Sequence, residues 1–339
     1  MRHPGPKRSK TNQHQSSAQA RALQGVRVGH ASDLRDLTGC TVVLAEGGAV
    51  CGVDVRGSAS STRELAPCIP GHVVDRIHGV FLTGGSAFGL DAAAGVMRFL
   101  ESEGIGFPTG AARVPIVPAA VIYDLAVGSA KARPDAKMAA QACRSASSKI
   151  TEGSVGAGTG ATVGKLFGIR CATKGGIGFR QITLAGKVAV QALVVVNAFG
   201  DVVDPATGRV IAGARKGTRS GEFADSLQEM IKGSFRKSFG AAHTTLAVVM
   251  TDAALDKVQA TKVAQMAQDG IARAISPTHT IYDGDLVFAL SVGKKRADLN
   301  TVGAAAAEAT AQAIVSAVLN AESLGGIPAC KDFAQPSGQ

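Results

Sequence analysis

Residues 188–196 form an almost continuous apolar run, and this run constrains the fold more than any other feature of the chain. Such a run is typical of a strand that is buried on both faces, because it leaves no alternate positions for solvent-facing polar side chains. The run therefore predicts a sheet that lies between other layers of structure.

Shorter apolar runs between glycine-marked turns predict more strands, and periodic segments predict helices. The predicted strands cover residues 41–44, 51–55, 79–82, 188–196, 245–250 and 286–291. The predicted helices cover residues 90–103, 135–147, 223–231, 256–275 and 302–321. The last helix has an alanine-rich face suited to close packing on a sheet. Because strands and helices mix without strict βαβ alternation, the order favours a layered α/β sandwich over a doubly wound fold.

The net charge of +10 is concentrated at the start of the chain, where six basic residues precede the first acidic one, Asp33. A basic tail rich in Ser and Gln is more often a solvated arm than a nucleic-acid site, so we expect no nucleic-acid partner. We assign residues 1–22 to a disordered basic tail and residues 23–339 to a single domain. Within the domain, residues 204–242 are charged and less hydrophobic, which predicts an exposed connection with one short helix.

The six cysteines are scattered without C-x-x-C spacing and are interpreted as reduced core residues. The seven histidines also lack the spacing of metal ligands, so we expect neither a metal nor another cofactor. The tail lacks the apolar segment of a signal peptide, and no run of about 18 uncharged apolar residues predicts a membrane span. We therefore expect a cytoplasmic protein with no membrane partner.

Two glycine-rich segments suggest known motifs that their details do not support. Residues 84–89 (GGSAFG) miss the G-x-S-x-G spacing of a nucleophile elbow, and we interpret them as a turn into the 90–103 helix. Residues 156–161 match G-x-G-x-x-A, but a poor strand precedes them and no acidic residue follows at the ribose position. A P-loop would need Gly instead of Thr159 and a hydroxyl instead of Leu166. What remains is a tight turn that delivers one lysine, Lys165.

Several polar residues stand where apolar elements begin or end. They are Thr244 at the mouth of the 245–250 run, Asn197 at the end of the 188–196 run, Asp283 and Asp285 ahead of the 286–291 run, and Tyr123 in an apolar stretch. Each has an ordinary structural interpretation, because threonines open strands, Asp and Asn cap turns, and tyrosines pack. Two carboxylates one residue apart on a strand, however, point to the same side and can hold a cation.

Taken together, these segments resemble the DmpA-type peptidase family, family S58, which includes β-aminopeptidases, L-aminopeptidase/D-esterases and nylon-oligomer hydrolases. The resemblance runs from about residue 25 to residue 332. It rests on residues 28–30 (VGH), 38–44 (TGCTVVL), 82–90 (LTGGSAFGL), 155–160 (VGAGTG), 174–178 (KGGIG) and the segments around Thr244 and Asp283.

The resemblance implies an αββα four-layer sandwich of the N-terminal-nucleophile type, a fold shared with ornithine acetyltransferase. It also implies an inactive chain that cuts itself before a Ser or Thr. By position, Thr244 matches this nucleophile, and the cut would separate an α segment, 1–243, from a β segment, 244–339, that stay together. His243 departs from the Gly or Asn typical of the family at this position, and residues 179–181 (FRQ) replace expected small residues.

The remaining site residues also follow from the resemblance, residue by residue. Lys165 and Asn197 match polar residues of the family's active site, Asp283 and Asp285 match its carboxylate pair, and Tyr123 matches a tyrosine of its pocket. Once Thr244 is N-terminal, its α-amine can act as general base for its own hydroxyl. We expect the carboxylates to orient that amine and pair with Lys165. We expect the amide of Asn197 and the hydroxyl of Tyr123 to donate to the oxyanion.

The sequence thus predicts a self-cleaving N-terminal-threonine aminopeptidase or amidohydrolase that acts on short peptides or related amides through an acyl-enzyme on Thr244. One alternative is an acyltransferase that passes this acyl group to an amine. Another is an uncleaved, non-catalytic member in which His243 blocks maturation. The resemblance also implies a homo-oligomer of αβ pairs, and it leaves open L-, D- and β-amino acid peptides and synthetic amides as substrates.

Overall fold

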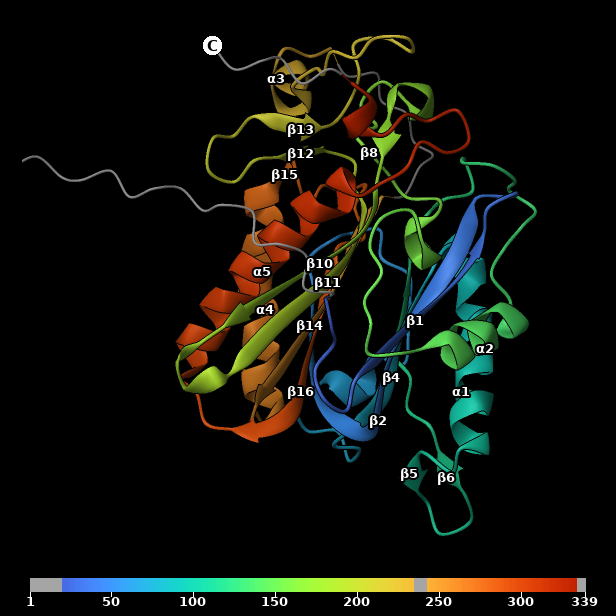
Figure 1. Ribbon diagram of the computed structural model, residues 1–339, viewed down its shortest axis with the longest axis vertical. Helices are drawn as coiled ribbons and strands as arrows, with labels where there is room; N and C mark the ends of the chain where they lie inside the picture. Colours follow the sequence, from blue (N-terminus) through green and yellow to red (C-terminus); the bar gives the residue numbers. More distant parts are fainter. Residues whose placement is uncertain (1–19, 235–242, 334–339) are drawn as a thin grey trace, which may run out of the picture.

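A computed structural model describes residues 20–234 and 243–333 of the chain. Two sheets pack face to face, and a pair of helices covers the outer face of each (Figure 1). The helices are α1 (Ala93–Ser102), α2 (Ala136–Ser145), α3 (Ser226–Ile231), α4 (Lys257–Ala274) and α5 (Leu299–Leu319). Helices α4 and α5 cover one side of the sandwich, and α1 and α2 cover the other. This is the predicted αββα sandwich.

The two sheets are continuous through one long strand. Along the hydrogen-bonded path the strand order is β10-β11-β14-β16-β2-β4-β7-β3, and β1 also pairs with β2. The bounds are β1 (Arg27–Asp33), β2 (Thr38–Val55), β3 (Thr62–Arg63), β4 (Ile77–Thr83), β7 (Ala119–Val121), β10 (Gly176–Thr183), β11 (Ala189–Asn197), β14 (Thr244–Ala253) and β16 (Leu286–Lys295). The first part of β2 pairs with β1 and β4, and its last part pairs with β16. The register shifts between Leu44 and Ala49, so β2 leaves one sheet and enters the other.

The predicted double-sided burial of the 188–196 run is confirmed. Val194 and Val196 pack in the core beneath α4 and α5, whereas Leu193 and Val195 pack in the core between the two sheets. Small residues let the outer helix approach closely, since a Cβ at Gly178 of β10 would lie 1.9 Å from the carbonyl oxygen of Ala313 in α5. By length and composition α5 could cross a membrane, but 72% of that stretch is buried inside the protein.

Three sequence expectations need correction. The predicted helix over residues 90–103 is confirmed over α1, but residues 90–92 belong to a preceding 3₁₀ helix, Ser86–Ala92. Ala22, which the prediction assigns to the tail, already donates its N–H to the carbonyl of Ser148. Residues 1–19 of the predicted tail lie outside the described residues.

The third correction concerns residues 204–234 of the predicted 204–242 connection, because residues 235–242 lie outside the described residues. Instead of a connection with only one helix, this region also contributes to a three-stranded sheet, in which β12 (Asp201–Val203) pairs with β13 (Val210–Ala212) and β15 (Ile275–Ser276). Arg215 is buried there, and its guanidinium donates to the carbonyls of Ala172, Arg170 and Thr218. Two small two-stranded sheets pair β5 (Phe107–Pro108) with β6 (Arg113–Val114), and β8 (Thr162–Val163) with β9 (Thr173–Lys174).

Candidate active site

Thr244 begins β14 in the middle of a sheet, between β11 and β16. The antiparallel register places Thr244 opposite Asn197, the last residue of β11. Side chains alternate along a strand, and Leu246 and Val248 of β14, like Val195 of β11, pack between the two sheets. Thr244 and Asn197 therefore also face the layer between the sheets, and both are buried.

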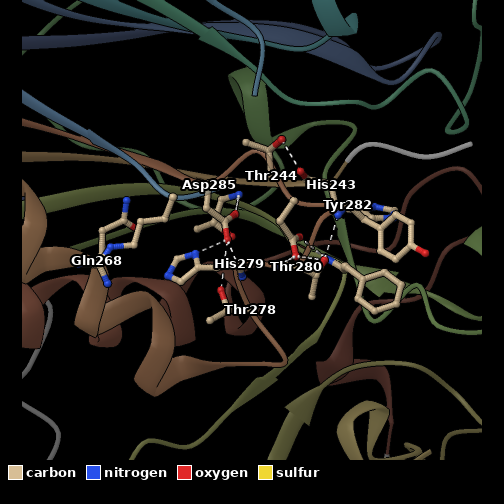
Figure 2. Close-up of polar contacts among 12 residues, drawn as sticks. His243, Thr244, Gln268, Thr278, His279, Thr280, Tyr282 and Asp285 are labelled. Atoms are coloured by element: carbon tan, nitrogen blue, oxygen red, sulfur yellow. Dashed lines mark hydrogen bonds and ion pairs between the residues drawn. The ribbon is translucent and has the colours of Figure 1, made fainter. Parts of the chain in front are cut away.

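The peptide bond ahead of Thr244 is held by hydrogen bonds. The carbonyl oxygen of His243 accepts from the N–H of Gly284 at 2.6 Å. It also accepts from the Thr244 hydroxyl at 2.5 Å (Figure 2). The N–H of His243 donates to the carbonyl of Tyr282 at 2.8 Å, as in a parallel strand pair. The hydroxyl of Thr244 therefore lies next to the carbonyl of the peptide bond that precedes it.

Gly284 can bring its N–H to the His243 carbonyl because it has no side chain that would collide with the neighbouring atoms. A Cβ at this position would lie 2.8 Å from the Thr244 Oγ and 2.9 Å from the carbonyl oxygen of Ala59. Real Cβ atoms essentially never come this close to other heavy atoms. The glycine between the two aspartates thus allows both its own N–H and the Thr244 hydroxyl to reach the carbonyl of His243.

Lys165 is buried and binds Asn197. Its ammonium donates to the Oδ1 of Asn197 at 2.8 Å and to the main-chain carbonyl of the same residue at 2.9 Å. The N–H of Thr162 also donates to this Oδ1, and the Nδ2 of Asn197 donates to the carbonyl of Tyr123. These contacts fix the orientation of the amide across the strand pair from Thr244.

The environment of Lys165 disfavours its charged form. Burial lowers its pKa to about 7, the positive charge of Lys174 adds to this effect, and the carboxylates of Asp283 and Asp124 oppose it. Close to neutral pH, Lys165 therefore exists in both the ammonium and the amine form. A lysine of this kind can accept a proton, whereas an ordinary exposed lysine stays charged.

The Asp283 carboxylate faces a loop instead of forming the predicted ion pair with Lys165. It accepts from the hydroxyl and N–H of Thr280 and from the N–H of Phe199. Burial raises its pKa, and the neighbouring charge of Asp285 raises it further. Its attraction for Lys165 acts at a distance, because neither carboxylate lies within ion-pair distance of that ammonium.

The Asp285 carboxylate anchors the second residue of β14. One oxygen accepts from the N–H of Thr245 at 2.6 Å, and the other accepts from the Thr278 hydroxyl and is hydrogen-bonded to Nδ1 of His279 at 2.9 Å (Figure 2). In the intact chain the two carboxylates therefore do not share Lys165 as a close ion-pair partner, and their predicted role of orienting the α-amine of a cut chain stays a prediction. Asp283 holds the loop ahead of β16, and Asp285 holds the start of β14.

The side chain of His243 is neutral and packed. Burial lowers its pKa to about 2, and the charge of Lys165 lowers it further. Its ring lies 5.4 Å from the ring of Phe199, which in turn packs against Tyr282. The histidine that departs from the family pattern thus occupies an aromatic pocket next to the peptide bond.

Comparison with known proteins identifies the family. Residues 22–330 match the sequence profile described as Peptidase family S58. The chain belongs to this family. It is 40% identical over 341 residues to an uncharacterized aminopeptidase of Mycobacterium leprae, a match that covers 90% of this chain and 91% of the relative. It is 33% identical to a 6-aminohexanoate-oligomer endohydrolase of Paenarthrobacter ureafaciens, over 79% of this chain and 73% of that enzyme. The protein is therefore a hydrolase.

Solved structures share the fold. The L-aminopeptidase D-Ala-esterase/amidase of Ochrobactrum anthropi, described as a new variant among the Ntn hydrolase fold, superposes with a TM-score of 0.67 at 19% identity and covers 90% of this chain and 86% of its own. A β-aminopeptidase of a Burkholderia species superposes with a TM-score of 0.62 at 22% identity, over 88% and 85% of the two chains. The four-layer architecture of this S58 member is thus that of its structural relatives.

Relative to the sequence-based prediction, the structure gathers Thr244, Lys165 and Asn197 but changes the surroundings. Tyr123 meets the site through its main-chain carbonyl, and the role of its hydroxyl stays a prediction. Sequence reasoning missed Gly284 and His279 as contacts of the site. Gly284 was visible as the residue between the two aspartates, whereas no periodicity or motif pointed to His279. Within residues 20–234 and 243–333, no group of three potential metal ligands gathers.

Proposed function

We propose that the chain cuts itself between His243 and Thr244 and then hydrolyses short peptides or related amides with the new N-terminal threonine. One observation carries the proposal. The carbonyl oxygen of His243 binds the N–H of Gly284 at 2.6 Å while the Thr244 hydroxyl lies 2.5 Å from the same oxygen. A nucleophile and an oxyanion donor thus meet at one peptide bond.

In the self-cleavage step, the Oγ of Thr244 attacks the carbonyl carbon of His243. The Gly284 N–H stabilises the negative charge that develops on the oxygen. The carbon–nitrogen bond breaks, the Oγ proton is transferred to the departing nitrogen, and an ester forms. Water then hydrolyses the ester to the His243 carboxylate and the free Thr244 hydroxyl. Before the cut the nitrogen of Thr244 is an amide, so another base must take the Oγ proton. Lys165 is our candidate for this base, because it binds Asn197, the strand partner of Thr244, and its lowered pKa leaves part of it neutral near pH 7.

After the cut, the α-amine of Thr244 becomes the base for its own hydroxyl. The hydroxyl attacks the amide carbon of the substrate, the amine part leaves, and water releases the acyl part from Thr244. Asp283 and Asp285 keep β14 and the loop ahead of β16 in place, and Lys165 with Asn197 supplies polar contacts opposite the nucleophile. The names of the relatives support aminoacyl amides and 6-aminohexanoate oligomers as the substrates to screen.

The test uses three chains: the wild type, Thr244→Ala and Thr245→Val. We expect the wild type to give two fragments by denaturing mass spectrometry, the smaller one beginning with Thr244. Thr244→Ala stays intact and inactive. Thr245→Val is the matched control, because the Thr245 hydroxyl is buried without a hydrogen-bond partner in the described part of the chain, and its loss leaves cleavage unchanged. A wild type that stays intact, or a Thr244→Ala chain that is cut and active, contradicts the proposal.

A further inference from the structure

Lys174 is a fully buried lysine to which the proposed reaction gives no role. It lies on β9 within the glycine-rich segment 174–178. Its ammonium donates to the carbonyl of Thr159 at 2.8 Å and to the carbonyl of Ala161 at 2.7 Å. A buried lysine is costly, because its charge loses hydration that two carbonyl oxygens replace only in part. A structural or functional role is therefore expected for Lys174.

The two carbonyls belong to the turn that leads to the active-site lysine. Directly after this turn, the N–H of Thr162 donates to the Oδ1 of Asn197 at 3.1 Å. Three residues later the N–H of Lys165 donates to the carbonyl of Phe199 at 2.9 Å. The contacts of Lys174 therefore fix one end of a short segment whose other end presents Lys165 to Asn197.

Lys174 also places a second positive charge near Lys165. Four ionisable groups face Lys165 from the surrounding elements: Asp283 from the loop ahead of β16, Asp124 from the segment after β7, Lys174 from β9 and the neutral His243 ahead of β14. Of these, Lys174 is the one whose positive charge disfavours the ammonium form of Lys165. A second cationic group beside a lysine is a known means of activating that lysine.

We propose that Lys174 is a positioning residue of the active site, which holds the 159–161 turn and thereby places Lys165 and Asn197 opposite Thr244. The inference rests on the proposed function, because it assigns Lys174 a part in making Lys165 the base of self-cleavage. Lys174 touches neither the peptide bond that is cut nor the substrate. It acts through the turn and through its charge.

The experiment compares the pH profile of self-cleavage in the wild type, Lys174→Met and Lys174→Gln. Methionine removes the charge and the donors, and glutamine removes the charge but keeps N–H donors. We expect self-cleavage to slow by about 10-fold or more in the Met variant, because misplacing a reacting group costs rate. We expect the midpoint of the acid limb to move up by about one pH unit in both variants, because the neighbouring positive charge is lost.

The matched control is Arg215→Met, which removes another buried cation that donates only to main-chain carbonyls. Arg215 is not among the groups whose charge acts on Lys165. We expect this variant to lose thermal stability but to keep the midpoint of the wild type. A purely structural role for Lys174 predicts the same behaviour for Lys174→Met, and a folded Met or Gln variant with wild-type midpoint and rate would overturn the inference.

A second readout does not depend on cleavage or on the folding of a Lys174 variant. In the intact Thr244→Ala chain, a pH titration followed by ¹³C NMR of the lysine Cε signals reports on Lys165 and Lys174 directly. We expect both to titrate well below the range of exposed lysines and in coupled steps, because each charge disfavours the other. If Lys165 titrates independently of Lys174, the inference is refuted. A wild type that never cuts itself counts against the proposed function and leaves this titration interpretable.

Discussion

The substitution Gly284→Ala tests whether the main-chain N–H of this residue is the oxyanion donor for self-cleavage. The added methyl group would lie 2.8 Å from the Thr244 Oγ and 2.9 Å from the carbonyl oxygen of Ala59. One neighbour is the nucleophile and the other is backbone, so the segment must move. Any such movement disturbs the hydrogen bond of 2.6 Å between Gly284 and the carbonyl of His243.

The expected magnitude follows from the loss of one donor. Removing a single oxyanion-hole donor slows acyl transfer by about 100-fold to 1,000-fold, or roughly 3 kcal/mol of transition-state stabilisation. Displacement of the Thr244 hydroxyl from its carbonyl adds to this loss. The cost in folding stability is smaller, about 1–3 kcal/mol for an overpacked methyl group. We therefore expect Gly284→Ala to fold and to cut itself at least 100-fold more slowly.

The assay measures the fraction of cut chain by intact mass against time after purification, together with thermal unfolding. Gly47→Ala is the matched control, because a Cβ at Gly47 meets no atom within 4 Å. It should cut at the wild-type rate. A folded Gly284→Ala chain that matches this rate would refute the role of the Gly284 N–H.

Three further predictions follow from the same site. His243→Phe should keep self-cleavage within a few-fold of wild type by the same assay, because the ring is packed and its pKa of about 2 leaves it no acid–base role. Asp285→Ala should lower the free energy of unfolding in urea by about 1–3 kcal/mol relative to Asp285→Asn, because the buried N–H of Thr245 loses its acceptor. The pKa values of Lys165 and Lys174 are about 7 in the folded chain against an ordinary 10.5, so the unfolded chain binds more protons between these values. Urea stability should therefore rise from pH 7 to pH 10, and less so in Lys165→Met.

The layered architecture could be predicted because the burial pattern is local. The run over residues 188–196 places apolar side chains on both faces of one strand, and this alone requires layers on both sides. The division of β2 between two sheets was not predictable in the same way. It depends on pairing with β4 at one end and β16 at the other, and partners far apart in the sequence leave no periodicity in the strand itself.

The site shows the same division between local and distant information. The meeting of Thr244 and Asn197 is a matter of strand register, and the resemblance to the family supplied it. The partners of the two aspartates in the intact chain were not predicted, because spacing along a strand says nothing about the loop that covers it. Residues 278–280 supply hydroxyl, imidazole and main-chain donors to both carboxylates, so Lys165 is not needed as their counter-ion.

The strand order determines how the two fragments could separate and refold after the proposed cut. Strands β14 and β16 follow the cut, yet they lie between β11 and β2, which precede it. The two fragments would therefore be interleaved within one sheet and could not separate without breaking its central pairings. Once unfolded, however, they would have to find each other by diffusion, so refolding would become a concentration-dependent, second-order reaction. The cut protein would then no longer refold reversibly as one chain. Its lifetime would instead depend on how slowly it unfolds.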